Sequence, residues 1–246
     1  MREKFKFSTG FINYLRIRKN AHSYSISTDD MLLKRNKYLA YRIIVPLFLF
    51  IGSLGVFSVI AHEIVLEKED WFDSLVFNLI KPYSSYRLIY TFKVLTFFGS
   101  GTFLFPAYIL LTFLLFYRGR KTDALHVAIL AVTSTIIIYA AKLFFARPRP
   151  DLPLFDTLDS YSFPSGHSMG SFVFVSILID EVWQSQLAKH WKWVISLFLL
   201  IMTLAVGISR IVLRYHYASD VAGGFSLGLA YLLFYFWIQK WKRFES

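Results

Sequence analysis

Long uncharged apolar runs alternate with short polar and basic stretches along this 246-residue chain. A membrane-spanning helix needs about 20 mostly apolar residues to cross a hydrocarbon core of about 30 Å. Six stretches approach that length and predict six spans, at residues 43–61, 94–117, 124–146, 165–183, 191–208 and 217–237. The pattern therefore predicts an all-α integral membrane bundle of six transmembrane helices.

The connection between the first and second predicted spans contains a shorter apolar pattern. Its large apolar residues recur at helical spacing, namely Trp71, Phe72, Leu75, Val76, Leu79 and Ile80. This spacing predicts a short amphipathic helix in a loop on the outer side of the membrane.

Lysine and arginine are distributed unevenly between the connections, which predicts the orientation of the bundle. Residues 1–42 hold ten basic and three acidic residues, for a net charge of +7. The second-to-third connection, the fourth-to-fifth connection and the tail are also basic, whereas the first-to-second connection is acidic. We therefore expect both termini in the cytoplasm. The predicted domains are a basic segment at 1–42, a six-span domain at 43–238 and a basic tail at 239–246.

Composition narrows the class of protein further. Hydrophobic residues make up 56% of the chain and charged residues 17%, against about 25% charged in a soluble domain. A soluble globule or a disordered chain is therefore not expected. The net charge of +11 follows from the predicted topology and from contact with anionic membrane lipids, so no nucleic acid partner is expected. The absence of cysteine excludes disulfides, thiolate metal sites and cysteine nucleophiles.

Ionisable residues gather near the predicted outer ends of the third to sixth spans. They are Lys142, Arg147, Arg149, His167, Arg210, His216 and Asp220. Charged residues at membrane depth are costly and mark candidate functional sites, although a single lysine or arginine at a span end can snorkel to the headgroups. Their combination on four neighbouring segments favours a functional site.

These residue types suit the binding of phosphate. Lys142 and Arg149 are seven positions apart, about two helical turns, so we expect them to share a helix face. Arginine offers a planar fork for phosphate oxygens, and lysine offers a point charge. Pro164 is typical of a helix start, where the backbone N–H groups of Ser165 and Gly166 would form an anion site.

His216 and Asp220 suggest nucleophilic chemistry. Their spacing of four predicts that they share one face of a helix. A carboxylate in that position holds one imidazole nitrogen protonated and leaves the other free to attack.

These residues resemble the signature of the type 2 phosphatidic acid phosphatase family, the lipid phosphate phosphatases, in its bacterial membrane branch. The signature has three parts, Lys-x6-Arg-Pro, Pro-Ser-Gly-His and Ser-Arg-x5-His-x3-Asp. They match Lys142–Pro150, Pro164–His167 and Ser209–Asp220, with all eleven fixed positions present. The resemblance covers about residues 43–238 and implies a membrane phosphatase.

The family pattern also implies a role for each matching residue. His216 would attack phosphorus and form a phosphohistidine, Asp220 would orient it, and His167 would protonate the leaving oxygen. The phosphate oxygens would be held by Lys142, Arg149, Ser165, Gly166 and Arg210. Three fixed cations would neutralise the transferring phosphoryl group, so the resemblance implies no metal and no cofactor.

The expected reaction is hydrolysis of a lipid phosphate or diphosphate at the outer face of a bacterial inner membrane. Candidate substrates are undecaprenyl diphosphate, phosphatidylglycerophosphate, phosphatidate and a lipid A phosphate. A lipid phosphotransferase would use the same site with a second lipid as acceptor. A non-catalytic lipid-binding membrane protein is the alternative from another functional class.

Overall fold

The computed structural model describes residues 28–62, 67, 70–81, 85–151, 154 and 159–245, with side chains from residue 43 to residue 239. The chain divides into two units, Met1–Leu47 and Phe48–Ser246. In the first unit, the described residues form the beginning of one helix. The predicted basic segment at 1–42 and the tail at 239–246 lie largely outside the described side chains. The proposed domain boundaries therefore stay a prediction.

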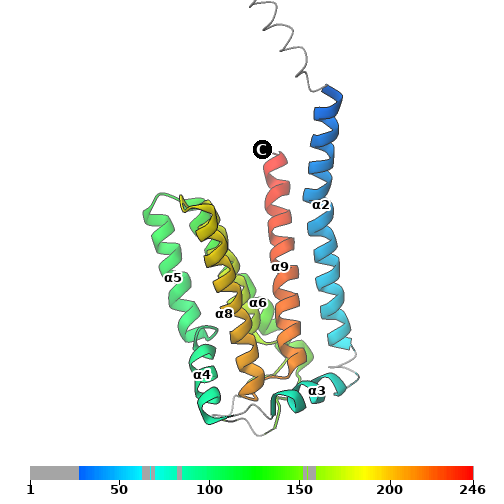
Figure 1. Ribbon diagram of the computed structural model, residues 1–246, viewed down its shortest axis with the longest axis vertical. Helices are drawn as coiled ribbons and strands as arrows, with labels where there is room; N and C mark the ends of the chain where they lie inside the picture. Colours follow the sequence, from blue (N-terminus) through cyan, green and yellow to red (C-terminus); the bar gives the residue numbers. More distant parts are fainter. Residues whose placement is uncertain are drawn as a thin grey trace, which may run out of the picture. The chain divides into compact units, whose positions relative to one another are not determined.

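Every regular element in the described part of the chain is helical, which confirms the predicted all-α class (Figure 1). The helices are α2 (Thr28–Val59), α3 (Trp71–Ile80), α4 (Tyr86–Phe97), α5 (Gly101–Tyr117), α6 (Lys121–Phe145), α7 (Gly166–Gln184), α8 (Lys189–Val212) and α9 (Ala218–Glu245). The short helix predicted in the first connection is α3.

Five described segments are long and apolar enough to cross a membrane. They are Ile43–His62, Tyr86–Tyr117, Lys121–Phe145, Lys189–Val212 and Ala218–Gln239. The predicted fourth span forms the 19-residue helix α7, which is not among these five because serines and ionisable residues lower its hydropathy. The ionisable residues are His167, Asp180 and Glu181.

The second predicted span differs from the structure at its beginning. A single helix from Val94 was expected, but the chain forms α4 and α5 with a break at Phe98–Ser100. The Ser100 hydroxyl accepts a hydrogen bond from the Phe103 N–H at 3.3 Å and caps α5. A Cβ at Gly99 would collide with Val206 and lie 3.2 Å from the His167 carbonyl. The chain therefore breaks at a residue without a side chain, where it passes close to α7 and α8.

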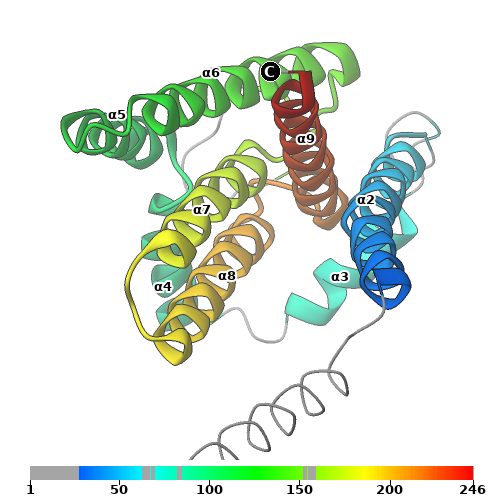
Figure 2. The same cartoon turned by 90° about the horizontal axis from the view of Figure 1, so that it is seen from above.

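Helix α7 packs against α5, α6, α8 and α9, and Figure 2 shows it running beside α8. Glycines allow α9 to approach α7 closely, as their spacing suggests. A Cβ on Gly224 would lie 2.6 Å from the Ser165 carbonyl oxygen, and one on Gly228 would lie 3.1 Å from Phe172. The Ser165 N–H donates a hydrogen bond to the Asp220 carbonyl at 3.0 Å. The starts of α7 and α9 are therefore held together.

Candidate active site

The predicted histidine and carboxylate pair forms, but not on one helix. His216 lies in the turn before α9, and Asp220 lies in the first turn of α9. Asp220 Oδ2 accepts a hydrogen bond from the Tyr217 N–H at 2.8 Å and lies 3.3 Å from His216 Nδ1. The carboxylate therefore caps the helix and faces the imidazole at the same time. Helix capping brings the two residues together, and the expected shared helix face is wrong.

His216 is buried and neutral. Burial lowers the pKa of its imidazole to about 3, and the hydrogen bond to Asp220 offsets this only in part. With Nδ1 facing the carboxylate, Nε2 is the nitrogen that keeps a lone pair. An N–H of Arg149 lies 3.3 Å from that Nε2 atom. Arginine is a side chain that commonly binds phosphate, so a candidate phosphate ligand lies beside Nε2, the nitrogen that could attack.

Lys142 and Arg149 also meet, but not through a shared helix face. Helix α6 ends at Phe145, and Ala146 adopts a left-handed conformation with φ of 46°. The residue before a proline avoids helical geometry, so the Arg147-Pro148 step prevents the helix from continuing. Lys142 and Arg149 converge because both donate to the Tyr161 carbonyl.

Arg149 is held by backbone carbonyls on two sides of the site. Its guanidinium donates to the Ser160 carbonyl at 2.6 Å and to the Tyr215 carbonyl at 2.6 Å. Burial lowers the pKa of this guanidinium, although an arginine remains charged at neutral pH. A partly desolvated cation in a fixed orientation is suited to an anionic ligand.

The predicted helix start lies at the same place. Ser165 is the N-cap of α7, and its hydroxyl accepts from the Ser168 N–H at 3.4 Å and from the Ser168 hydroxyl at 2.9 Å. The Ser165 N–H, which was expected in the anion site, donates instead to the Asp220 carbonyl at 3.0 Å. The N–H groups of Gly166 and His167 lie in the first helical turn, where no intrahelical acceptor exists. His167 is close enough to interact electrostatically with Arg210 and His216.

Arg210 completes the cluster from α8. Its guanidinium donates to the Thr96 hydroxyl of α4 at 2.8 Å and lies 4.4 Å from the centre of the Tyr215 ring. Its Nε atom is buried and has no hydrogen-bond partner among the described residues. A buried, unpaired N–H on a cation is costly unless a ligand satisfies it.

Some residues of this site were not predicted from the sequence. The Ser162 hydroxyl donates to Asp220, and Arg147 donates to Asp220 at 2.7 Å and to Asp73 of α3 at 2.8 Å. In the sequence, Arg147 is one more cation near a span end, and Asp73 is one of several charges in the acidic first-to-second connection. Its position as the one ionisable residue of a mostly apolar helix is the signal that could reveal its burial.

The structure thus brings every predicted site residue to one end of the Phe48–Ser246 unit. A buried neutral imidazole faces a carboxylate, and cationic side chains of Lys142, Arg149 and Arg210 lie around it. No group of three or more metal-ligating side chains occurs in the part of the chain that is described. The arrangement is suited to binding a phosphoryl group and attacking it with a ring nitrogen.

Comparison with known proteins agrees with this chemistry. The PAP2 superfamily profile matches residues 123–244. Phosphatidylglycerophosphatase B of Bacillus subtilis is 35% identical over 159 residues, which are 62% of this chain and 76% of that protein.

Two solved structures have folds similar to that of this chain. The transmembrane PAP2 type phosphatidylglycerolphosphate phosphatase from Bacillus subtilis has 29% identity and a TM-score of 0.63, over 79% of this chain and 96% of that chain. Aquifex aeolicus LpxE has 26% identity and a TM-score of 0.51, over 65% of this chain and 92% of that chain. With its helical membrane fold and its phosphate-suited site, this chain belongs to the PAP2 superfamily and is a membrane lipid phosphatase.

Proposed function

We propose that this enzyme hydrolyses phosphatidylglycerophosphate to phosphatidylglycerol and phosphate, through a phosphohistidine on His216 and without a metal ion. The choice of substrate is supported by similarity to a curated relative and to a solved structure, both from Bacillus subtilis, whose names include that activity. The observation that carries the mechanism is the buried His216, with Nδ1 facing Asp220 and Nε2 beside Arg149.

The reaction proceeds in two displacements. Nε2 of His216 attacks phosphorus, and the bond from phosphorus to the lipid oxygen breaks. His167 donates a proton to that oxygen, so phosphatidylglycerol leaves as an alcohol. A water molecule then attacks the phosphohistidine and gives a proton to His167, and the phosphorus–nitrogen bond breaks. Phosphate leaves, and both histidines return to their starting states.

The charged side chains act on the phosphoryl oxygens. Lys142, Arg149 and Arg210 neutralise the three equatorial oxygens, and the buried Nε of Arg210 gains the partner it lacks. The N–H groups at the start of α7 and the Ser165 hydroxyl donate further hydrogen bonds. These fixed cations take the place that Mg²⁺ has in kinases, which supports a metal-independent reaction.

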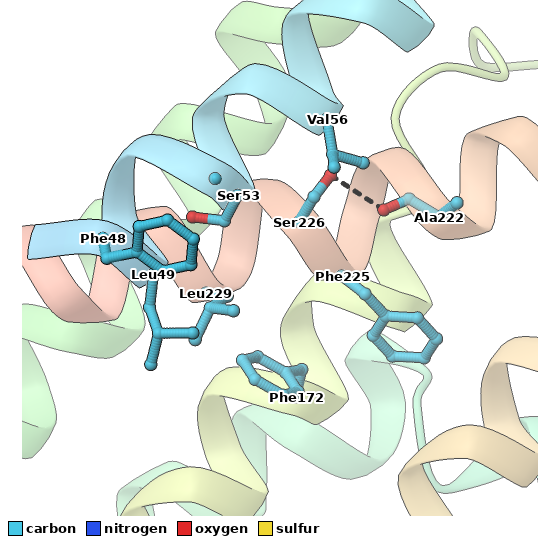
Figure 3. Close-up of a pocket in the computed structure, with 10 residues that line it drawn as sticks. Phe48, Leu49, Ser53, Val56, Phe172, Ala222, Phe225, Ser226 and Leu229 are labelled. Atoms are coloured by element: carbon cyan, nitrogen blue, oxygen red, sulfur yellow. Dashed lines mark hydrogen bonds between the residues drawn. The ribbon is translucent and has the colours of Figure 1, made fainter. Parts of the chain in front are cut away.

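An apolar cavity supports a substrate with a lipid tail. It measures about 420 Å³ and is lined from three helices (Figure 3). The lining residues are Phe48, Leu49, Gly52, Ser53 and Val56 of α2, Phe172 of α7, and Ala222, Phe225, Ser226 and Leu229 of α9. Both serine hydroxyls donate to carbonyls of their own helices, so they offer little to a polar ligand. The wall from α9 begins two residues after Asp220, so we assign the cavity to an acyl chain of the bound lipid.

Phosphate release from a panel of lipids tests this function. Purified protein in detergent is given phosphatidylglycerophosphate, phosphatidate, undecaprenyl diphosphate and a lipid A phosphate in the presence of EDTA. We expect release in EDTA, the highest kcat/KM for phosphatidylglycerophosphate, and no release by His216→Ala. Loss of activity in EDTA that Mg²⁺ restores would contradict metal independence, and an active His216→Ala would contradict the phosphohistidine. Phosphate transfer to an added lipid alcohol in place of release would identify a phosphotransferase.

A further inference from the structure

The catalytic carboxylate receives a cation that the family signature does not contain. Asp220 accepts hydrogen bonds from His216 and the Tyr217 N–H, from the Ser162 hydroxyl, and from Arg147. Among these donors within the described residues, Arg147 is the one that carries a positive charge when His216 is neutral. It is five positions after Lys142, inside the variable part of the first motif.

Arg147 is held from the other side by α3. One guanidinium nitrogen donates to Asp220 at 2.7 Å, and the other donates to Asp73 at 2.8 Å. The side chain is 10% exposed, whereas the carboxylates of Asp73 and Asp220 are 2% and 0% exposed. Its guanidinium also lies 4.0 Å from the centre of the Tyr217 ring. Arg147 is therefore held between two buried carboxylates and an aromatic ring.

Asp73 in turn holds the start of α9. Its carboxylate accepts from the Ser219 N–H at 2.8 Å and from the Ser219 hydroxyl at 2.6 Å. Ser219 also accepts from Arg147 at 2.8 Å. A continuous buried network thus runs from α3 through Arg147 to Asp220 and the imidazole of His216.

The network has more negative than positive charge. Two buried carboxylates share one guanidinium, so removing the guanidinium leaves two negative charges that water cannot screen. Without Asp73, the guanidinium loses one anchor and can rotate away from Asp220. Without Arg147, both carboxylates lie unpaired in a buried site.

We infer that Arg147 and Asp73 are positioning residues for the reaction, and that α3 is thereby part of the catalytic apparatus. The polar contacts of both side chains are with each other, with Asp220 and with Ser219, so we assign neither of them a contact with the phosphate. Each acts by fixing Asp220, which sets the orientation of the His216 ring. The inference rests on the proposed function, because it requires His216 to be the nucleophile.

The network predicts a specific kinetic signature. Lys142, Arg149 and Arg210 hold the phosphate and are not members of the network, so KM should remain nearly unchanged. The orientation of the attacking ring sets kcat, which should fall about 10-fold in Asp73→Asn, since small misplacements of reacting groups cost up to about 100-fold.

The test compares Asp73→Asn with the control Asp70→Asn, and repeats Asp73→Asn in a chain that already carries Arg147→Gln. Asp73→Asn removes a charge and keeps the shape of the side chain. Asp70→Asn makes the same change three residues earlier, at an exposed position whose side chain makes no capping hydrogen bond. Both are made in the wild-type chain, and Asp73→Asn is also made in an Arg147→Gln chain. The activity of each variant on phosphatidylglycerophosphate and its inhibition constant for inorganic phosphate are measured.

We expect Asp73→Asn to lower kcat in the wild-type chain and to leave KM and phosphate inhibition unchanged, while Asp70→Asn has no effect. In the Arg147→Gln chain, Asp73→Asn should cost nothing or restore activity, because it removes a carboxylate that has lost its cation. The retained phosphate inhibition shows that each variant is folded at the site.

Three results would overturn the inference. The first is full activity of Asp73→Asn, and the second is an equal loss in both backgrounds, which would assign Asp73 a structural role through Ser219 alone. The third is a loss of activity that results from a higher KM and not from a lower kcat. An inactive wild type, or an active His216→Ala, would instead overturn the proposed function and the inference with it.

Discussion

At the scale of single residues, each buried charge of the site is oriented by a specific set of hydrogen bonds. Arg149 donates to carbonyls of Ser160 and Tyr215 and lies beside His216 Nε2. A lysine would supply one charge but not the planar set of donors that makes these contacts together.

Arg149→Lys should therefore lower kcat/KM for phosphatidylglycerophosphate by about 10- to 100-fold, because the bidentate geometry is lost while the charge is kept. Steady-state kinetics of the purified variant measures this effect. Arg118→Lys, a change at an exposed position in the α5–α6 loop, is the matched control and should be neutral. Kinetics equal to the wild type would mean that Arg149 does not touch the phosphate.

The buried imidazole of His216 also predicts how stability depends on pH. Its pKa is about 3 in the folded protein, against 6.5 for an ordinary histidine. Between these values the unfolded chain binds a proton that the folded chain does not bind, so stability rises with pH. The loss of stability thus begins as pH falls below about 6.5 and continues toward about 3.

Thermal unfolding in detergent at several pH values measures this dependence. The wild type should lose more stability than His216→Gln as pH falls from about 6.5 to about 4, because the variant has no imidazole to protonate. Titrating groups that do not contact His216 contribute similarly to both proteins and largely cancel in the difference. Parallel curves for the two proteins would contradict a buried neutral His216.

At the scale of helices, two glycines of α2 differ in their position relative to the proposed acyl-chain cavity. Gly52 lines the cavity, whereas Gly55 does not, and a Cβ at either position would meet nothing within 4 Å. The two glycines therefore accept the same substitution but differ in what a larger side chain would fill.

Gly52→Leu should lower kcat/KM for dioleoyl phosphatidylglycerophosphate relative to the dioctanoyl lipid, because the leucine occupies the space of the longer chain. The expected change in this ratio is roughly three- to fivefold, since a lipid tail in the bilayer is already in apolar surroundings and only packing is lost. Gly55→Leu should leave the ratio unchanged. Equal ratios in all three proteins would place the acyl chain elsewhere.

At the scale of the whole molecule, single introduced cysteines can test the orientation of the bundle, because the chain contains no cysteine of its own. The basic connections predict that the α5–α6 loop faces the cytoplasm and that the end of the bundle with His216 faces outward. Arg118 and Asp159 are exposed positions near these two ends, and each can be changed to cysteine singly.

A membrane-impermeant maleimide applied to intact bacterial cells should label Asp159→Cys at once. Arg118→Cys should react only after the membrane is permeabilised. The native chain is the control, because it offers no thiol. The reverse pattern would place the site on the cytoplasmic side and contradict the proposed orientation.

Sequence by itself determined the helical class, most of the spans and the residue types of the site. Apolar runs of membrane length allow few structures besides helices, because backbone groups in lipid must be hydrogen-bonded within the segment. Ser165 could be recognised as a helix start from the proline before it and the glycine after it. The motif spacing groups the three cations with two histidines and one carboxylate.

Only the tertiary structure decided how these residues meet. The end of α6 at Ala146, the break at Gly99 and the turn that carries His216 depend on local conformations that apolar periodicity does not encode. Arg147 links Asp73 to Asp220, which is 147 positions later in the chain. Asp73 also binds Ser219, which is 146 positions later. Charge alone did not distinguish Arg147 and Asp73 from solvated residues. Their role follows from burial, because two carboxylates in a dry site require the guanidinium that the fold places between them.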